Sequence, residues 1–152
     1  MIYIAHRGLT HGVDKDKENN PEWIREVLKQ GYSAEIDLNV YDNKLYLGHD
    51  EPQYEIEFDF LRDNKEKLWI HAKDRIALEW MIRTGHLLNY FWHQKDDFTI
   101  TSYGYVWNYP GKPLTAFSIC NQPELKREFK PETYKQTEGI GVCSKFVGLM
   151  NK

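Results

Sequence analysis

The chain has 152 residues, 41% of them hydrophobic and 14% aromatic, with a formal net charge of −3. This length and composition predict a single globular domain over residues 1–152 with one core. The charge argues against a nucleic-acid partner, and no window approaches the roughly 18 apolar residues of a membrane span. The N-terminus has no secretory apolar run, so we expect a cytoplasmic protein whose cysteines, Cys120 and Cys143, are reduced.

Apolar runs and turn signals predict strands that alternate with helices along the chain. The expected strands span residues 1–6, 33–40, 44–48, 68–72, 98–101, 114–120 and 139–143, and a further apolar run spans 87–92. The expected helices span 21–31, 58–65, 74–85 and 124–129. Such alternation is typical of a parallel sheet with right-handed crossovers.

Polar side chains gather where the expected strands end, and they decide which parallel fold we expect. They are His6, Glu35, Asp37, His71, Lys73 and His93. In a parallel barrel these strand ends share one rim, where active sites lie. Residues 86–120 have almost no helical signal, and the chain is short for a full barrel. The sequence therefore predicts an α/β fold, a compact TIM-type barrel with several crossover helices reduced or missing.

Glu35 and Asp37 are two residues apart on one expected strand, so their carboxylates point to the same face. Two buried carboxylates repel each other unless something compensates their charge. One interpretation is a divalent cation, and an all-oxygen pair suits Mg²⁺ or Ca²⁺. The other is that both are solvated or paired with Arg7 and Lys73. The pattern alone leaves both open.

Two histidines follow different strands, and His6 and His49 could serve as a general acid and base near neutral pH. A structural role is the alternative for each. Arg7 and Lys73 supply positive charge for a phosphate or for a carboxylate partner. Aromatic residues alternate over 101–111, where packing and stacking on a sugar or polyol are both open interpretations.

Four motifs in order over residues 2–50 resemble the glycerophosphodiester phosphodiesterase family, within the superfamily of phosphatidylinositol-specific phospholipases C. They are His-Arg-Gly at 6–8, Glu-Asn at 18–19, Glu-x-Asp at 35–37 and His-Asp at 49–50. The family's third strand usually carries Glu-x-Lys, whereas this chain has His71 before Lys73. Near the last strand, Lys145 stands where an acid is usual.

The resemblance implies a TIM-type barrel, one divalent cation and cleavage of a small phosphodiester substrate. It assigns the metal to Glu35 and Asp37, with Glu18 and His71 as further candidate ligands. Mg²⁺ or Ca²⁺ is then expected, or Mn²⁺ or Zn²⁺ if His71 is a ligand. By the same resemblance His6 and His49 are the general acid and base, and Arg7 and Lys73 hold the phosphate. Apart from the resemblance, His93 at a strand end and Trp107 in the aromatic segment are candidates for binding the substrate.

Two other functions stay open at this point. The departures at His71 and Lys145 favour a degenerate, non-catalytic module that binds phosphate or polyol. Metal-assisted chemistry on another ester is the third reading, because a fold hosts many reactions. The leading hypothesis, a metal-dependent phosphoric diester hydrolase, is favoured by the presence of both His6 and His49. The oligomeric state is not indicated.

Overall fold

The computed structural model describes residues 1–150, and all ten strands of that part belong to one sheet. The strands are β1 (Ile2–Ala5), β2 (Ser33–Tyr41), β3 (Lys44–Leu47), β4 (Tyr54–Ile56), β5 (Leu68–Ala72), β6 (Tyr90–Phe91), β7 (Phe98–Ile100), β8 (Val106–Asn108), β9 (Ser118–Asn121) and β10 (Gly141–Ser144). The α-helices are α1 (Pro21–Lys29), α2 (Phe58–Asp63) and α3 (Arg75–Arg83). Short 3₁₀ turns are η1 (His6–Gly8), η2 (Gly85–Leu87), η3 (Pro123–Leu125) and η4 (Pro131–Thr133).

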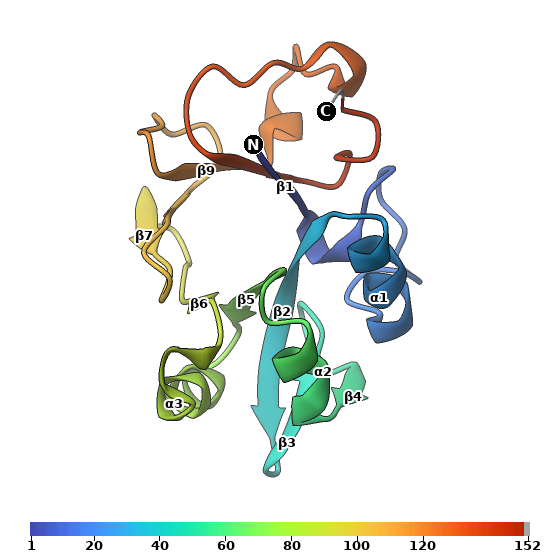
Figure 1. Ribbon diagram of the computed structural model, residues 1–152, viewed down its shortest axis with the longest axis vertical. Helices are drawn as coiled ribbons and strands as arrows, with labels where there is room; N and C mark the ends of the chain where they lie inside the picture. Colours follow the sequence, from blue (N-terminus) through green and yellow to red (C-terminus); the bar gives the residue numbers. More distant parts are fainter. Residues whose placement is uncertain (151–152) are drawn as a thin grey trace.

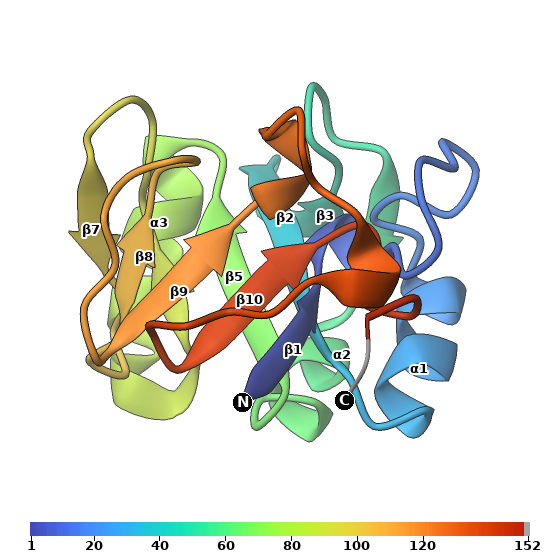
Figure 2. The same ribbon diagram turned by 90° about the horizontal axis from the view of Figure 1, so that it is seen from above.

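The expected parallel sheet is confirmed. Seven strands run parallel in the order β6-β5-β2-β1-β10-β9-β8. Antiparallel strands extend it at two places: β3 and β4 continue from the long β2, and β7 pairs with β8. Figure 2 shows β1, β10, β9, β8 and β7 side by side along the curve of this sheet.

The expected TIM-type barrel is wrong. The sheet is a curled half-barrel, and only three α-helices flank it in the described part of the chain. Its ladder does not close, because the two-residue β6 pairs only with β5 and the short β7 only with β8. The physical reason lies in residues 88–117, which hold three short strands and no crossover helix to press them into a ring.

The two faces of the sheet bury different side chains. In β2, Ala34, Ile36 and Leu38 join the large apolar core beneath α1, α2 and α3, and Figure 1 shows these helices outside the curve. Glu35 and Asp37 alternate with them and point inward. The inward apolar cluster lies below the carboxylates, and it consists of Ile4, Trp69, Phe91, Trp107, Ile119 and Cys143. The alternation in β2 therefore places two acids inside the curve.

Local sequence signals explain the best-predicted helix. The Asn20 side chain caps α1 by accepting hydrogen bonds from the backbone N–H groups of Glu22 and Trp23, and Pro21 occupies the first turn. The helix expected at 124–129 is instead the single turn η3. Strands β4 and β8 were not expected.

Both cysteines are free thiols, and they lie on opposite faces of the sheet. Cys143 belongs to the inward cluster, and Cys120 packs against a separate outer cluster that includes Val27 and Val142. Within residues 1–150, the helices are all too short or too polar to cross a bilayer.

Candidate functional site

Nine of the ten sequence-predicted site residues line one cavity of about 350 Å³ at the carboxyl ends of the parallel strands. They are His6, Arg7, Glu35, Asp37, His49, His71, Lys73, His93 and Trp107. They come from β2, β5, β8 and the segments that follow β1, β3 and β6. Residues far apart in sequence thus form one site, because neighbouring parallel strands end at the same edge of the sheet. Glu18 lies outside this set.

Glu35, Asp37 and His71 form a cluster whose three possible ligand atoms all lie within 4.8 Å of one another. The β2–β5 register pairs Asp37 directly with His71, so the two side chains share the inner face. The His71 Nδ1 atom lies 3.3 Å from Asp37 Oδ1 and 3.9 Å from Glu35 Oε1. Both carboxylates are buried, 2% and 1% exposed. Asp37 Oδ1 is buried and has no hydrogen-bond donor in the described protein, so one acceptor is left for another ligand.

The other nitrogen of His71 determines what Nδ1 can do. Nε2 lies 2.9 Å from the backbone oxygen of His93, and a carbonyl can only accept. Nε2 therefore carries the proton, and in the neutral ring Nδ1 has a free lone pair facing the two carboxylates. A ring held in this way by a carbonyl is the usual arrangement of a metal-bound histidine. The residues present thus fit a divalent cation with two oxygen ligands and one nitrogen ligand.

Burial and mutual repulsion keep the two carboxylates in different states. Burial, and then the charge of Asp37, raise the pKa of Glu35 to about 7. Burial also acts to raise the pKa of Asp37, but His71, which has this effect only when Nδ1 also carries a proton, together with Lys73 and Arg7 outweighs burial and holds that pKa below its ordinary value. Glu35 is therefore the less compensated member of the pair, and a cation between them would remove the repulsion.

Arg7 and Lys73 lie beside Asp37. Pairing with these two residues was the alternative that the sequence offered to a metal site. Arg7 Nε is 3.4 Å and Lys73 Nζ is 3.7 Å from the Asp37 carboxylate oxygens. The Arg7 guanidinium also binds Glu18, and Lys145 Nζ lies 3.6 Å from the same Glu18 oxygen. Glu18 thus has two cationic partners and is not part of the cluster, and Lys145 has a defined role as one of them.

His6 and His49 lie in different environments. His6 is 7% exposed; its Nε2 is 3.8 Å from Glu35, and its Nδ1 is buried without a partner. Burial, followed by the charge of Arg7, lowers the pKa of His6 to about 3, so the ring is neutral at pH 7. His49 is partly exposed, and its Nδ1 lies 2.6 Å from Asp50. With Nδ1 engaged by Asp50, Nε2 of His49 is available to a molecule in the cavity.

The structure also gives a role to Asn19, which belongs to the Glu-Asn motif at 18–19 but was assigned no function from the sequence. Asn19 is buried; its Nδ2 donates to Asp37 Oδ2, and its Oδ1 accepts from the Asp37 backbone N–H, both at 2.9 Å. Its φ of 56° is left-handed, as are those of Arg7 (54°) and Gln122 (48°), which line the cavity. Non-glycine residues in this region cluster at functional sites. The signal in the sequence was the Glu-Asn motif at 18–19, directly before Asn20, which caps the helix.

The aromatic segment is not one continuous strand with a shared face. The Trp107 ring is 3% exposed and stacks on Phe91 with 4.5 Å between centroids, so it belongs to the floor of the cavity. Tyr105 packs on Trp69. Tyr109 reaches the cavity and meets His93 edge-on at 5.9 Å. Packing explains most of the alternation.

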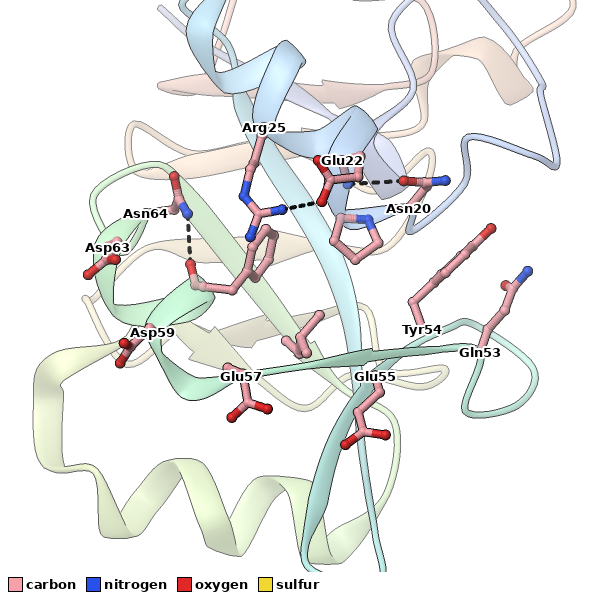
Figure 3. Close-up of a pocket in the computed structure, with 13 residues that line it drawn as sticks. Asn20, Glu22, Arg25, Gln53, Tyr54, Glu55, Glu57, Asp59, Asp63 and Asn64 are labelled. Carbon is pink, nitrogen blue, oxygen red and sulfur yellow. Dashed lines mark hydrogen bonds and ion pairs between the residues drawn. The ribbon is translucent and has the colours of Figure 1, made fainter.

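A larger and more open pocket of about 740 Å³ lies elsewhere, between α1, β4 and α2 (Figure 3). Its wall carries several acids, and its one lining cation, Arg25, pairs with Glu22 and lies over the Phe60 ring. None of the predicted site residues lines it. We place the chemistry in the smaller cavity, because the buried titratable groups are there.

Comparisons with known proteins add no relative. No family model matches the chain, and searches of curated proteins and of solved structures find no significant match.

Proposed function

We propose that this protein is a metal-dependent phosphodiesterase related to the glycerophosphodiester phosphodiesterases. The observation that carries the proposal is the joint placement of the Glu35–Asp37–His71 cluster, flanked by Arg7 and Lys73, in one cavity with two histidines. A binding module has no need for histidines on two sides of a buried cation site. The motif order in the sequence supports the same activity.

The cation would be held by Glu35, Asp37 and Nδ1 of His71. A nitrogen ligand moves the preference from Mg²⁺ and Ca²⁺ toward Mn²⁺ or Zn²⁺. When bound, the cation supplies a positive charge that stabilises phosphoryl oxygens. Lys73 projects into the same cavity and contributes a second charge for the phosphate, while Arg7 is the more fully compensated of the two by its pairs with Glu18 and Asp37.

The environments of the two histidines suggest their roles. His6 starts neutral because burial lowers its pKa, so a ring nitrogen is free to accept the proton of the attacking hydroxyl, and an anionic phosphate in the cavity would raise its basicity toward the working pH. The Asp50 carboxylate lies 2.6 Å from His49 Nδ1 and orients the ring, which leaves Nε2 for the leaving alcohol. His49 is then suited to give a proton to the leaving alcohol. In this assignment His6 gains one proton from the attacking hydroxyl, and His49 gives one proton to the oxygen of the leaving alcohol.

The test is hydrolysis of a chromogenic phosphodiester by metal-stripped protein refilled with Mg²⁺, Ca²⁺, Mn²⁺ or Zn²⁺. We expect turnover with Mn²⁺ or Zn²⁺, and a loss of about two to four orders of magnitude in His6→Ala and in His49→Ala. His86→Ala is the matched control, since His86 is exposed on η2 and lies outside the cavity. Turnover that survives in both variants, or that is independent of metal, would refute the proposal.

A further inference from the structure

One wall of the cavity has no charged side chain. The lining residues with full charges, Arg7, Glu35, Asp37 and Lys73, all belong to β2 or to the segments that follow β1 and β5. The wall built by the segments after β6, β8 and β9 presents amides and a phenol instead. Its polar members other than His93 are Gln94, Tyr109, Asn121 and Gln122. We call these four residues the neutral wall.

Asn121 is the member of the neutral wall with an unmet hydrogen-bonding requirement. It lies at the end of β9 and points inward, two residues after Ile119 of the inward cluster. Its Oδ1 is buried and has no donor among the described residues. A buried acceptor without a donor is unfavourable, and a donor on a bound molecule would remove that penalty.

The backbone beside Asn121 is also held in an uncommon conformation. Gln122 has a φ of 48°, and its N–H donates to the backbone oxygen of Cys143 at 2.8 Å. This left-handed residue follows directly after β9, and its side chain lines the cavity next to Asn121. A second observation therefore supports a ligand-binding role for this part of the cavity.

The neutral wall does not suit a cationic group. A quaternary ammonium needs open aromatic faces or a free carboxylate. The Trp107 ring is 3% exposed and stacked on Phe91, so Tyr109, which is 39% exposed and meets His93 edge-on, is a single open ring rather than a set of faces that could surround a cation. Of the cavity's two carboxylates, Asp37 is already surrounded by His71, Arg7 and Lys73, and Glu35 is the one assigned to the proposed metal ion.

We propose that the neutral wall selects the alcohol part of the phosphodiester, and that it accepts an uncharged polyhydroxy alcohol rather than an amino alcohol. Asn121 accepts a hydrogen bond from one of its hydroxyl groups. This inference rests on the proposed phosphodiesterase function and adds the class of substrate.

The test compares kcat/KM for glycerophosphoinositol and glycerophosphocholine, with a chromogenic phosphodiester measured alongside. We expect the inositol diester to be preferred at least tenfold, the value of one good hydrogen bond. Asn121→Leu should lower that preference at least fivefold. Asn121→Asp places a carboxylate in the wall and should shift the ratio toward the choline diester. Gln30→Leu, an exposed amide at the end of α1, is the matched control.

A binding measurement gives a readout that does not need turnover. Saturation-transfer NMR with inositol 1-phosphate and with phosphocholine should show contacts from the ring protons of the former, and these should weaken in Asn121→Leu. If no diester is hydrolysed with any ion, the proposed function fails and this inference falls with it. If the chromogenic diester is hydrolysed but the two natural diesters are used equally, or Asn121→Leu leaves their ratio unchanged, only the present inference is overturned.

Discussion

Replacing Glu35 with Gln should stabilise the metal-free protein at alkaline pH. Burial and the charge of Asp37 raise the pKa of Glu35 from 4.5 to about 7. At 1.36 kcal/mol for each pH unit, that difference corresponds to about 3 kcal/mol. Because the pKa is raised on folding, the favourable contribution of the protonated carboxyl is complete below pH 4.5 and is lost as the pH rises through about 7. Gln resembles the protonated carboxyl at every pH, and its Oε1 can still accept from the Arg7 backbone N–H, as Glu35 does at 2.9 Å.

The assay is urea unfolding in the presence of a chelator, followed by tryptophan fluorescence, at pH 4.5 and at pH 8.5. Glu35→Gln and the wild type should have similar free energies of unfolding at the lower pH, and the variant should be about 3 kcal/mol more stable at the higher one. Burial lowers the pKa of His6 to about 3, so both proteins lose stability as the pH falls below about 6.5, and this effect cancels in the comparison. Glu26→Gln, whose exposed carboxylate pairs with Lys29, should change stability by less than about 1 kcal/mol at either pH.

Adding Mn²⁺ or Zn²⁺ should reverse the order, because the ion stabilises the native state by binding to it and Gln is a poorer ligand than a carboxylate. A variant that is less stable than the wild type at pH 8.5 without metal would show that Glu35 is already compensated. The argument for a cation in the cluster would then lose its basis.

Three further perturbations test the support of the site. Asn19→Ala removes both hydrogen bonds to Asp37 and should weaken metal affinity about 10- to 100-fold by calorimetric titration. Gly8→Ala should destabilise the fold by at least about 1 kcal/mol in urea, since Gly8 has a φ of 79° and an added Cβ would lie 2.9 Å from Ile24 Cγ1. His71→Glu should change the preferred ion from Mn²⁺ or Zn²⁺ to Mg²⁺ or Ca²⁺ in the same titration, and an unchanged preference would exclude His71 as a ligand.

The sequence indicated the inward acids because a strand has a period of two, and β2 is long enough for the pattern to be clear. It indicated the position of α1 from a local cap. It did not show that Asp37 lies opposite His71, because the register between two strands depends on tertiary packing rather than on either strand alone. The contact between Asn19 and Asp37 was missed for a related reason, since the two residues are 18 positions apart.

The barrel prediction failed where local signals are weakest. Alternating strands and helices establish a parallel sheet, but closure depends on strand length and on pairing at the last edge. β6 has two residues and β7 has three, and neither length was evident from the apolar runs at 87–92 and 98–101. No single motif in the sequence indicates that β6 and β7 are too short to close a barrel.

The candidate site does not need the part of the fold that departs from expectation. The two carboxylates lie on β2, His71 lies on β5, and Lys73 directly follows β5. Both strands share the large core with α1, α2 and α3. Those strands have the packing to hold buried charges in fixed positions. The neutral wall comes instead from the short strands, where no α-helix covers the outer face (Figure 1). On the proposed division, the metal cluster lies on the well-packed half of the sheet and the alcohol is selected on the lightly packed half. Substitutions at residues such as Asn121 would then change the preferred substrate without disturbing the cluster.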